Sequence, residues 1–293
     1  MLLEAGAERG PRNQSRAHGA RCGGTLAVVW LGVCYNVGMY RQQVTSEEIA
    51  CETLRLSGAA AHHLMHVLRA QVGTEVGAFD GAGRTRLYHV VAREPEALLL
   101  QAKQPIFSSA HPPVETVLFA CIPKGERMDW MLEKATELGV MRIVPVMSAR
   151  TVVRLEGKQA VAKQARWQRI VEAAARQCGA THIPEVTLPM AFEATIPLMK
   201  QCTTLIVAAL IPGAKPLKPV LDALDPVAPE QMWGWWCGPE GDFTEAEMQT
   251  ILACGAQPVT LGPLILRVET AAIYGMATLG CARNNRPPVL SGE

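Results

Sequence analysis

The sequence lacks the cysteine pattern of a disulfide-stapled or zinc-binding protein. Its nine cysteines are scattered, odd in number and never spaced as Cys-x-x-Cys. Disulfide frameworks and zinc sites both need cysteines at paired, regular spacings, so neither class fits. Scattered thiols suit a reducing compartment, and we expect the protein in the cytoplasm.

The sequence also lacks an excess of either charge. Its 28 Lys and Arg residues nearly balance 27 Asp and Glu residues, so net charge does not indicate a nucleic-acid partner. Positive charge is nevertheless concentrated between residues 150 and 176, where seven cations accompany only Glu156 and Glu172. These cations are Arg150, Arg154, Lys158, Lys163, Arg166, Arg169 and Arg176. They form either a phosphate-binding surface or an ordinary solvated helix face.

No apolar run is long enough for a membrane span. The best candidate, residues 25–40, is shorter than the roughly 20 residues that a span needs. Arginines precede it as in a signal peptide, but no clean small-x-small cleavage site follows. We therefore interpret residues 1–39 as an extension outside the folded domains, with Met39 as the biological start. A membrane-anchored form that uses residues 25–40 is the alternative.

Residues 40–110 show short β-like segments at 51–56, 75–79, 87–92 and 97–102. Asp80-Gly81 predicts a tight hairpin, and apolar spacing over residues 58–70 predicts one helix. This pattern predicts a small β-barrel with one helix. His-Pro-Pro at residues 111–113 is a plausible linker to a second domain.

Strands then alternate with helices, which predicts an α/β domain over residues 114–285 with a mainly parallel sheet, followed by a tail at 286–293. The strands are expected at 114–121, 142–146, 205–210, 232–237 and 258–261. The helices are expected at 127–138, 158–177, 244–255 and 268–279. Thr244 and Glu247 form a capping box. The helix at 158–177 is expected to bury Val161, Ala165, Ile170, Ala173 and Ala174.

Two glycine-bearing loops end strands and open helices in this second domain. The first loop is residues 237–244 (CGPEGDFT), and the second loop is residues 261–267 (LGPLILR), followed by VETA. Such loops present backbone groups to a small ligand, and glycine lets the main chain approach it closely. The alternative is that these glycines only make turns.

These loops, together with residues 63–69 (HLMHVLR), 134–140 (KATELGV) and 166–178, occur in the order of a known family. Over residues 40–285 the chain resembles the bacterial family that methylates N3 of a uridine in 16S ribosomal RNA, within the SPOUT superfamily. The resemblance implies a PUA-like β-barrel that binds RNA, then a trefoil-knotted, mainly parallel sheet that binds S-adenosylmethionine. It also implies a homodimer that acts on the small ribosomal subunit. Asp242 stands where the family commonly has a second glycine, and Asp tolerates turn geometry.

The resemblance implies a set of cofactor-binding residues in and around the two loops. They are Leu210, Gly238, Pro239, Glu240, Gly241, Leu261, Gly262, Leu264, Leu266 and Thr270. Uridine N3 must lose a proton before it attacks, and Arg267 is the candidate to stabilise the resulting charge. Glu240 is expected to orient the substrate or take the proton, and Glu269 or Thr270 to hold Arg267. Alternatively, Glu240 and Glu269 only complement helix dipoles.

We expect phosphate contacts from five arginines, with two further polar residues lining the RNA entrance or simply facing solvent. The arginines are Arg69, Arg84, Arg86, Arg154 and Arg166, and the other two are Glu172 and Gln177. His62, His63 and His66 lack the glutamate of HExxH and a third ligand, so we expect no metal.

The sequence is also compatible with two other functions. One is a non-catalytic ribosome-assembly factor that binds RNA with the same fold. The other is a SPOUT enzyme that methylates a ribose 2'-hydroxyl.

Overall fold

The computed structural model describes residues 27–30, 33–36, 40–110, 112, 114–226 and 230–284. The chain divides into two compact units, Met1–Tyr40 and Arg41–Glu293. In the first unit, strands β1 (Ala27–Trp30) and β2 (Val33–Asn36) pair antiparallel. The rest of the predicted extension, including Met39, and the predicted tail lie outside the described residues.

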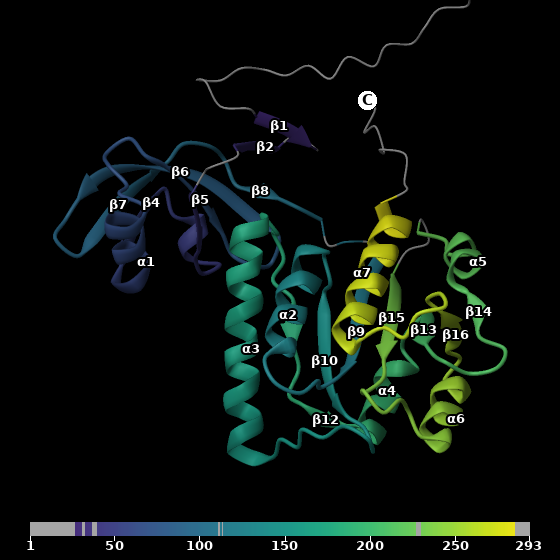
Figure 1. Cartoon of the computed structure of the whole chain (residues 1–293). Coiled ribbons are helices and arrows are strands. Elements are labelled where there is room, and N and C mark those ends of the chain that lie inside the picture. Colours follow the sequence, from purple (N-terminus) through teal and green to yellow (C-terminus); the bar gives the residue numbers. More distant parts are fainter. Residues whose placement is uncertain are drawn as a thin grey trace, which may run out of the picture. The chain divides into compact units, whose positions relative to one another are not determined.

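The second unit begins with a small antiparallel β-domain (Figure 1). In the described residues its six-stranded sheet has the order β3-β5-β6-β7-β4, with β8 beside β6. The elements are β3 (Tyr40–Gln43), η1 (Glu48–Ala50), β4 (Thr53–Ser57), α1 (Gly58–His62), η2 (His63–Val67), β5 (Glu75–Phe79), β6 (Arg84–Arg93), β7 (Ala97–Ala102) and β8 (Phe107–Ser108). The predicted hairpin and helix are confirmed, although the helix ends at Val67 with a π-helical turn.

An α/β domain follows, built on a parallel sheet as predicted. Its strand order among the described residues is β11-β10-β9-β15-β13-β16-β14, with β12 beside β10. The strands are β9 (Val114–Cys121), β10 (Arg142–Met147), β11 (Glu185–Val186), β12 (Met190–Ala191), β13 (Thr204–Ala208), β14 (Lys215–Pro216), β15 (Gln231–Cys237) and β16 (Gln257–Thr260). The helices are α2 (Arg127–Glu137), α3 (Gly157–Cys178), η3 (Phe192–Thr195), α4 (Ile196–Met199), α5 (Leu217–Asp222), α6 (Glu245–Ala253) and α7 (Val268–Asn284).

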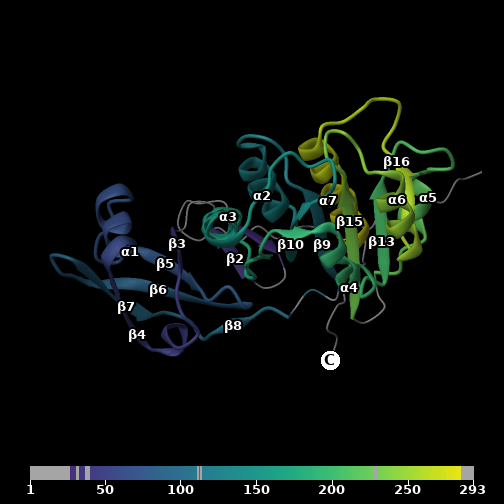
Figure 2. The same cartoon turned by 90° about the horizontal axis from the view of Figure 1, so that it is seen from below.

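Two hydrophobic cores lie on opposite faces of this sheet. Helices α2, α3, α5 and α7 cover one face, and α4 and α6 cover the other. Figure 2 shows α2 and α7 on one side of the strands and α4 on the other. Strand β15 contributes to both cores, because Trp235 points to the α7 side and Trp236 stacks on Phe119 on the other. A Cβ at Gly275 would lie 2.0 Å from the Trp235 ring, so α7 needs this glycine to pack on β15.

The predicted buried face of α3 is wrong in part. Val161, Ala165 and Ala173 are exposed. The residues that α3 buries are Ala160, Trp167, Val171, Ala174 and Ala175. Trp167 has the largest apolar surface of the helix, and residues at helical spacing from it form the buried face.

Of the helices that the structure describes, none has the length and apolar character needed to traverse a lipid bilayer.

Candidate functional site

A cavity of about 280 Å³ lies at the carboxyl ends of β13, β15 and β16, which are neighbours in the sheet. Residues 208–210, the first loop and the second loop contribute its walls. Ligands of open α/β sheets bind at this edge of the strands. The sheet topology therefore joins the two loops, which are separate in the sequence, at one site.

The first loop contributes Gly238, Pro239 and Glu240 to the cavity wall. Asp242 has a φ of 60°, so it adopts the left-handed turn geometry expected of it. The predicted capping box is confirmed, because the Thr244 hydroxyl accepts from the Glu247 N–H and the Glu247 carboxylate accepts from the Thr244 N–H. Gly241 does not line the cavity, and its α-carbon faces the Arg150 side chain instead.

The second loop contributes four of the predicted cofactor-binding residues to the same cavity. A fifth predicted residue, Leu210, also lines the cavity and lies just after β13. The four are Leu261, Gly262, Leu264 and Leu266. Gly262 has a φ of 108°, a conformation that favours glycine. Leu264 and Leu210 are exposed although apolar, so the mouth of the cavity offers apolar surface to a ligand. Thr270 lies beyond the lining, in the first turn of α7.

The charged groups at the cavity are arranged differently from the prediction. Arg267 lines the cavity, and within the described ranges its guanidinium forms no hydrogen bond or ion pair. Among the described residues, neither Glu269 nor Thr270 bonds to this guanidinium, so their expected hold on Arg267 stays a prediction. Glu269 lies instead 3.9 Å from Arg127, and Arg127 is also 3.4 Å from Glu240. The sequence analysis did not predict a role for Arg127. The sequence indicated only that Arg127 begins a helix.

A thiol forms part of the cavity wall but is not poised to react. Cys237 ends β15, and the indole Nε1 of Trp235 lies 3.1 Å from its sulfur. Burial raises the pKa of Cys237 well above its ordinary value, and burial also raises the pKa of Cys121 to about 12. Both thiols therefore stay protonated at neutral pH, and neither serves as a nucleophile.

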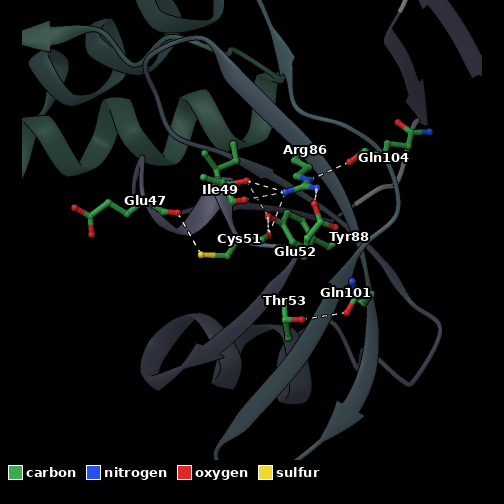
Figure 3. A network of polar contacts seen from close by, with 10 residues as sticks. Glu47, Ile49, Cys51, Glu52, Thr53, Arg86, Tyr88, Gln101 and Gln104 are labelled. Carbon is green, nitrogen blue, oxygen red and sulfur yellow. Dashed lines mark hydrogen bonds and ion pairs between the residues drawn. The ribbon is translucent and has the colours of Figure 1, made fainter.

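Arg86, predicted to contact phosphate, has a structural role in the β-domain. It is only 7% exposed, and its guanidinium donates to the carbonyl oxygens of Ala50 and Cys51 at 3.2 Å and of Gln104 at 3.0 Å (Figure 3). It also pairs with Glu52. Because every one of these bonds lies inside the domain, Arg86 is not available to RNA, which corrects the prediction.

The other predicted RNA contacts lie closer to the surface. Arg69 is exposed, and Arg84 is half-buried in an ion pair with Asp80 at 2.7 Å. Arg154 is exposed but donates to the carbonyls of Ser148 and Ala149, and Arg166 pairs with Asp129. On α3, Gln177 is exposed and Glu172 is half-buried.

The three histidines lie on the exposed side of α1 and η2. The rings of His62 and His66 are 4.6 Å apart between centroids. No group of three or more His, Cys, Asp or Glu side chains suited to a metal occurs in the part of the chain that the structure describes.

Comparisons with known proteins match both domains. A family described as RNA methyltransferase domain matches residues 110–280, and one described as RNA methyltransferase PUA domain matches residues 56–103. Ribosomal RNA small subunit methyltransferase E of Bacillus subtilis is 27% identical and covers 84% of this chain and 94% of its own length. The protein of that name from Synechocystis is 31% identical, over 82% of this chain and 77% of its own.

A solved structure agrees with these relatives. Ribosomal RNA small subunit methyltransferase E from Neisseria gonorrhoeae, bound to S-adenosyl methionine, is 30% identical to this chain with a TM-score of 0.71. The match covers 83% of this chain and 97% of the other. The chain therefore belongs to the family of RNA methyltransferases that includes ribosomal RNA small subunit methyltransferase E.

Proposed function

We propose that this chain transfers a methyl group from S-adenosylmethionine to N3 of a specific uridine in 16S ribosomal RNA. The observation that carries the proposal is the cavity between the two loops, with the guanidinium of Arg267 on its wall. The Neisseria relative, whose match covers nearly all of its own chain, supports the choice of cofactor.

The residues that line the cavity fit this cofactor. Leu261, Leu264 and Leu266 offer apolar surface and backbone groups for an adenine ring, and Gly238 and Gly262 let the main chain approach. When bound, S-adenosylmethionine would supply a methyl group on a sulfonium. Uracil N3 would attack the methyl carbon in line as the carbon–sulfur bond breaks and the thioether, S-adenosylhomocysteine, leaves. The protein's part is to hold the two reactants in that alignment.

Arg267 and a carboxylate carry the remaining chemistry. When uracil N3 loses its proton, negative charge spreads onto the neighbouring carbonyl oxygens, and the guanidinium of Arg267, which has no bond to another described residue, stabilises that charge. Glu240 lines the cavity and is the carboxylate placed to orient the base or take its proton. Glu269 is more buried and does not line the cavity.

RNA binding combines phosphate contacts with extrusion of the target base. Arg69, Arg154 and Arg166 are exposed cations for phosphates, with Arg84 as a half-buried fourth. The target uridine must leave its stack to reach the cavity. The PUA match of the β-domain supports its role in RNA binding.

We also propose that the protein acts as a homodimer through α2 and α7. These helices pack together, and Trp130 on α2 and Tyr274 on α7 are 47% and 43% exposed. Large exposed aromatic side chains are enriched at protein interfaces.

Two further proposals concern the fold and the location of the protein. The resemblance supports a trefoil knot in the parallel-sheet domain, and the scattered cysteines support a cytoplasmic location.

Nucleoside mass spectrometry tests this function. The full chain is incubated with labelled S-adenosylmethionine and small ribosomal subunits that lack the modification, and the 16S RNA is digested to nucleosides. We expect 3-methyluridine. A 2'-O-methylated nucleoside would instead identify a ribose methyltransferase, and no incorporation at saturating cofactor would leave an RNA-binding assembly factor.

A further inference from the structure

Arg127 links the two loops of the cavity. It is the first residue of α2, and its Nη1 lies 3.4 Å from Glu240 Oε1 and 3.9 Å from Glu269 Oε2. Glu240 belongs to the first loop, and Glu269 is in the first turn of α7, directly after the second loop. A single guanidinium from a third element therefore faces one carboxylate from each side of the cavity.

Glu269 depends on this cation. Its side chain is only 12% exposed, and its Oε2 is buried with no hydrogen-bond partner among the described residues. Within those residues, Arg127 is the sole cation that forms an ion pair with Glu269. A carboxylate that is buried without compensation is costly to keep ionised, so the nearby guanidinium stabilises the position of Glu269.

Glu240 is held at the same point by a second donor. The backbone N–H of Lys124, just before α2, donates to Glu240 Oε1 at 3.3 Å. Neither Arg127 nor Glu269 lines the cavity. The Arg127 guanidinium therefore acts on the position of the loops rather than on a bound ligand. Its removal would leave the negative charges of Glu240 and Glu269 without the positive charge that lies between them.

We propose that Arg127 is a positioning residue that holds the two loops at the separation that S-adenosylmethionine requires. This inference rests on the proposed function of the cavity. Loss of the cation loosens both loops at once. Affinity for the cofactor then falls more than the rate of methyl transfer at saturating cofactor.

Calorimetric titration of the full chain with S-adenosylmethionine tests the proposal. R127Q is expected to raise the Kd on the order of tenfold, and R127K less. The double variant R127Q/E269Q is expected to regain part of that affinity, because it also removes the uncompensated carboxylate. The matched control is K218Q, which removes an exposed cation that pairs with Asp222 on α5 and is expected to leave the Kd unchanged.

Single-turnover methyl transfer at saturating cofactor supplies the second readout, and we expect R127Q to stay within about threefold of the native rate. A Kd for R127Q within about twofold of native, or no recovery in the double variant, overturns the proposal. If R127Q does not fold, R127K and E269Q decide, because each weakens the ion pair outside the cavity wall and must raise the Kd of a folded protein.

Measurements on the native chain distinguish a failure of the positioning role of Arg127 from a failure of the proposed methyltransferase function. If the native chain binds no S-adenosylmethionine, the proposed function fails. If it binds and methylates while R127Q behaves identically, only the positioning role of Arg127 fails.

Discussion

Arg150 donates a hydrogen bond from Nη1 to the carbonyl oxygen of Gly241 at 2.7 Å, across 91 positions of the sequence. The same nitrogen lies 3.3 Å from the carbonyl oxygen of Phe243. Next to it, the N–H of Ala149 donates to Glu247 Oε1 at 2.7 Å. The segment after β10 therefore fixes both the first loop and the beginning of α6.

Replacing Arg150 by glutamine should weaken cofactor binding. A hydrogen bond from a charged donor contributes roughly 1.5–3 kcal/mol, and part of that energy here holds the first loop in shape. We expect R150Q to raise the Kd for S-adenosylmethionine about five- to tenfold, measured by calorimetry. K218Q serves as the control, and equal affinities for R150Q and native protein would show that the loop keeps its shape without Arg150.

Gly262 should not tolerate a side chain. Its φ of 108° is strained for any residue with a Cβ, at a cost of about 1–3 kcal/mol. We expect G262A to lower cofactor affinity about tenfold or more, because the second loop must change conformation. The control P263A changes a neighbouring residue of the same loop but leaves Gly262 in place, so its Kd for S-adenosylmethionine should stay close to the native value. Unchanged binding by G262A would contradict this view of the loop.

Arg86 should matter for stability. R86Q leaves buried carbonyl oxygens without their donor, and we expect a loss of about 2–3 kcal/mol in the free energy of unfolding. Urea denaturation followed by circular dichroism measures it. A native-like unfolding midpoint for R86Q would contradict the structural role.

Arg69 should behave in the opposite way. It is exposed, so R69Q should change the free energy of unfolding by less than about 0.5 kcal/mol. Its affinity for 16S RNA should fall, and the slope of log affinity against log salt should decrease by about one. A filter-binding titration at several salt concentrations measures both, and an unchanged slope would remove Arg69 from the phosphate contacts.

Local chemistry made much of the fold predictable. The alternation of apolar strands with helices identified the parallel sheet, and the Thr244 and Glu247 spacing identified the start of α6. Asp242 was expected to keep the turn, and it does so with a positive φ. Each of these features depends on residues close together in the sequence.

Features that depend on distant partners were not predictable. The buried face of α3 is set by how Trp167 packs on the sheet domain, and periodicity alone selected Val161 instead. The structural role of Arg86 was not predictable, because the carbonyls that surround its guanidinium come from segments up to 37 positions away. Arg127 was missed because the carboxylates it faces are separated from it by more than 100 positions.

The rate of methyl transfer by R267Q at saturating S-adenosylmethionine is the most direct test of the site. If the guanidinium stabilises charge on the uracil as transfer proceeds, the rate should fall on the order of 100-fold while the Kd for the cofactor stays within about threefold of native. A variant that methylates 16S RNA at the native rate would contradict the account.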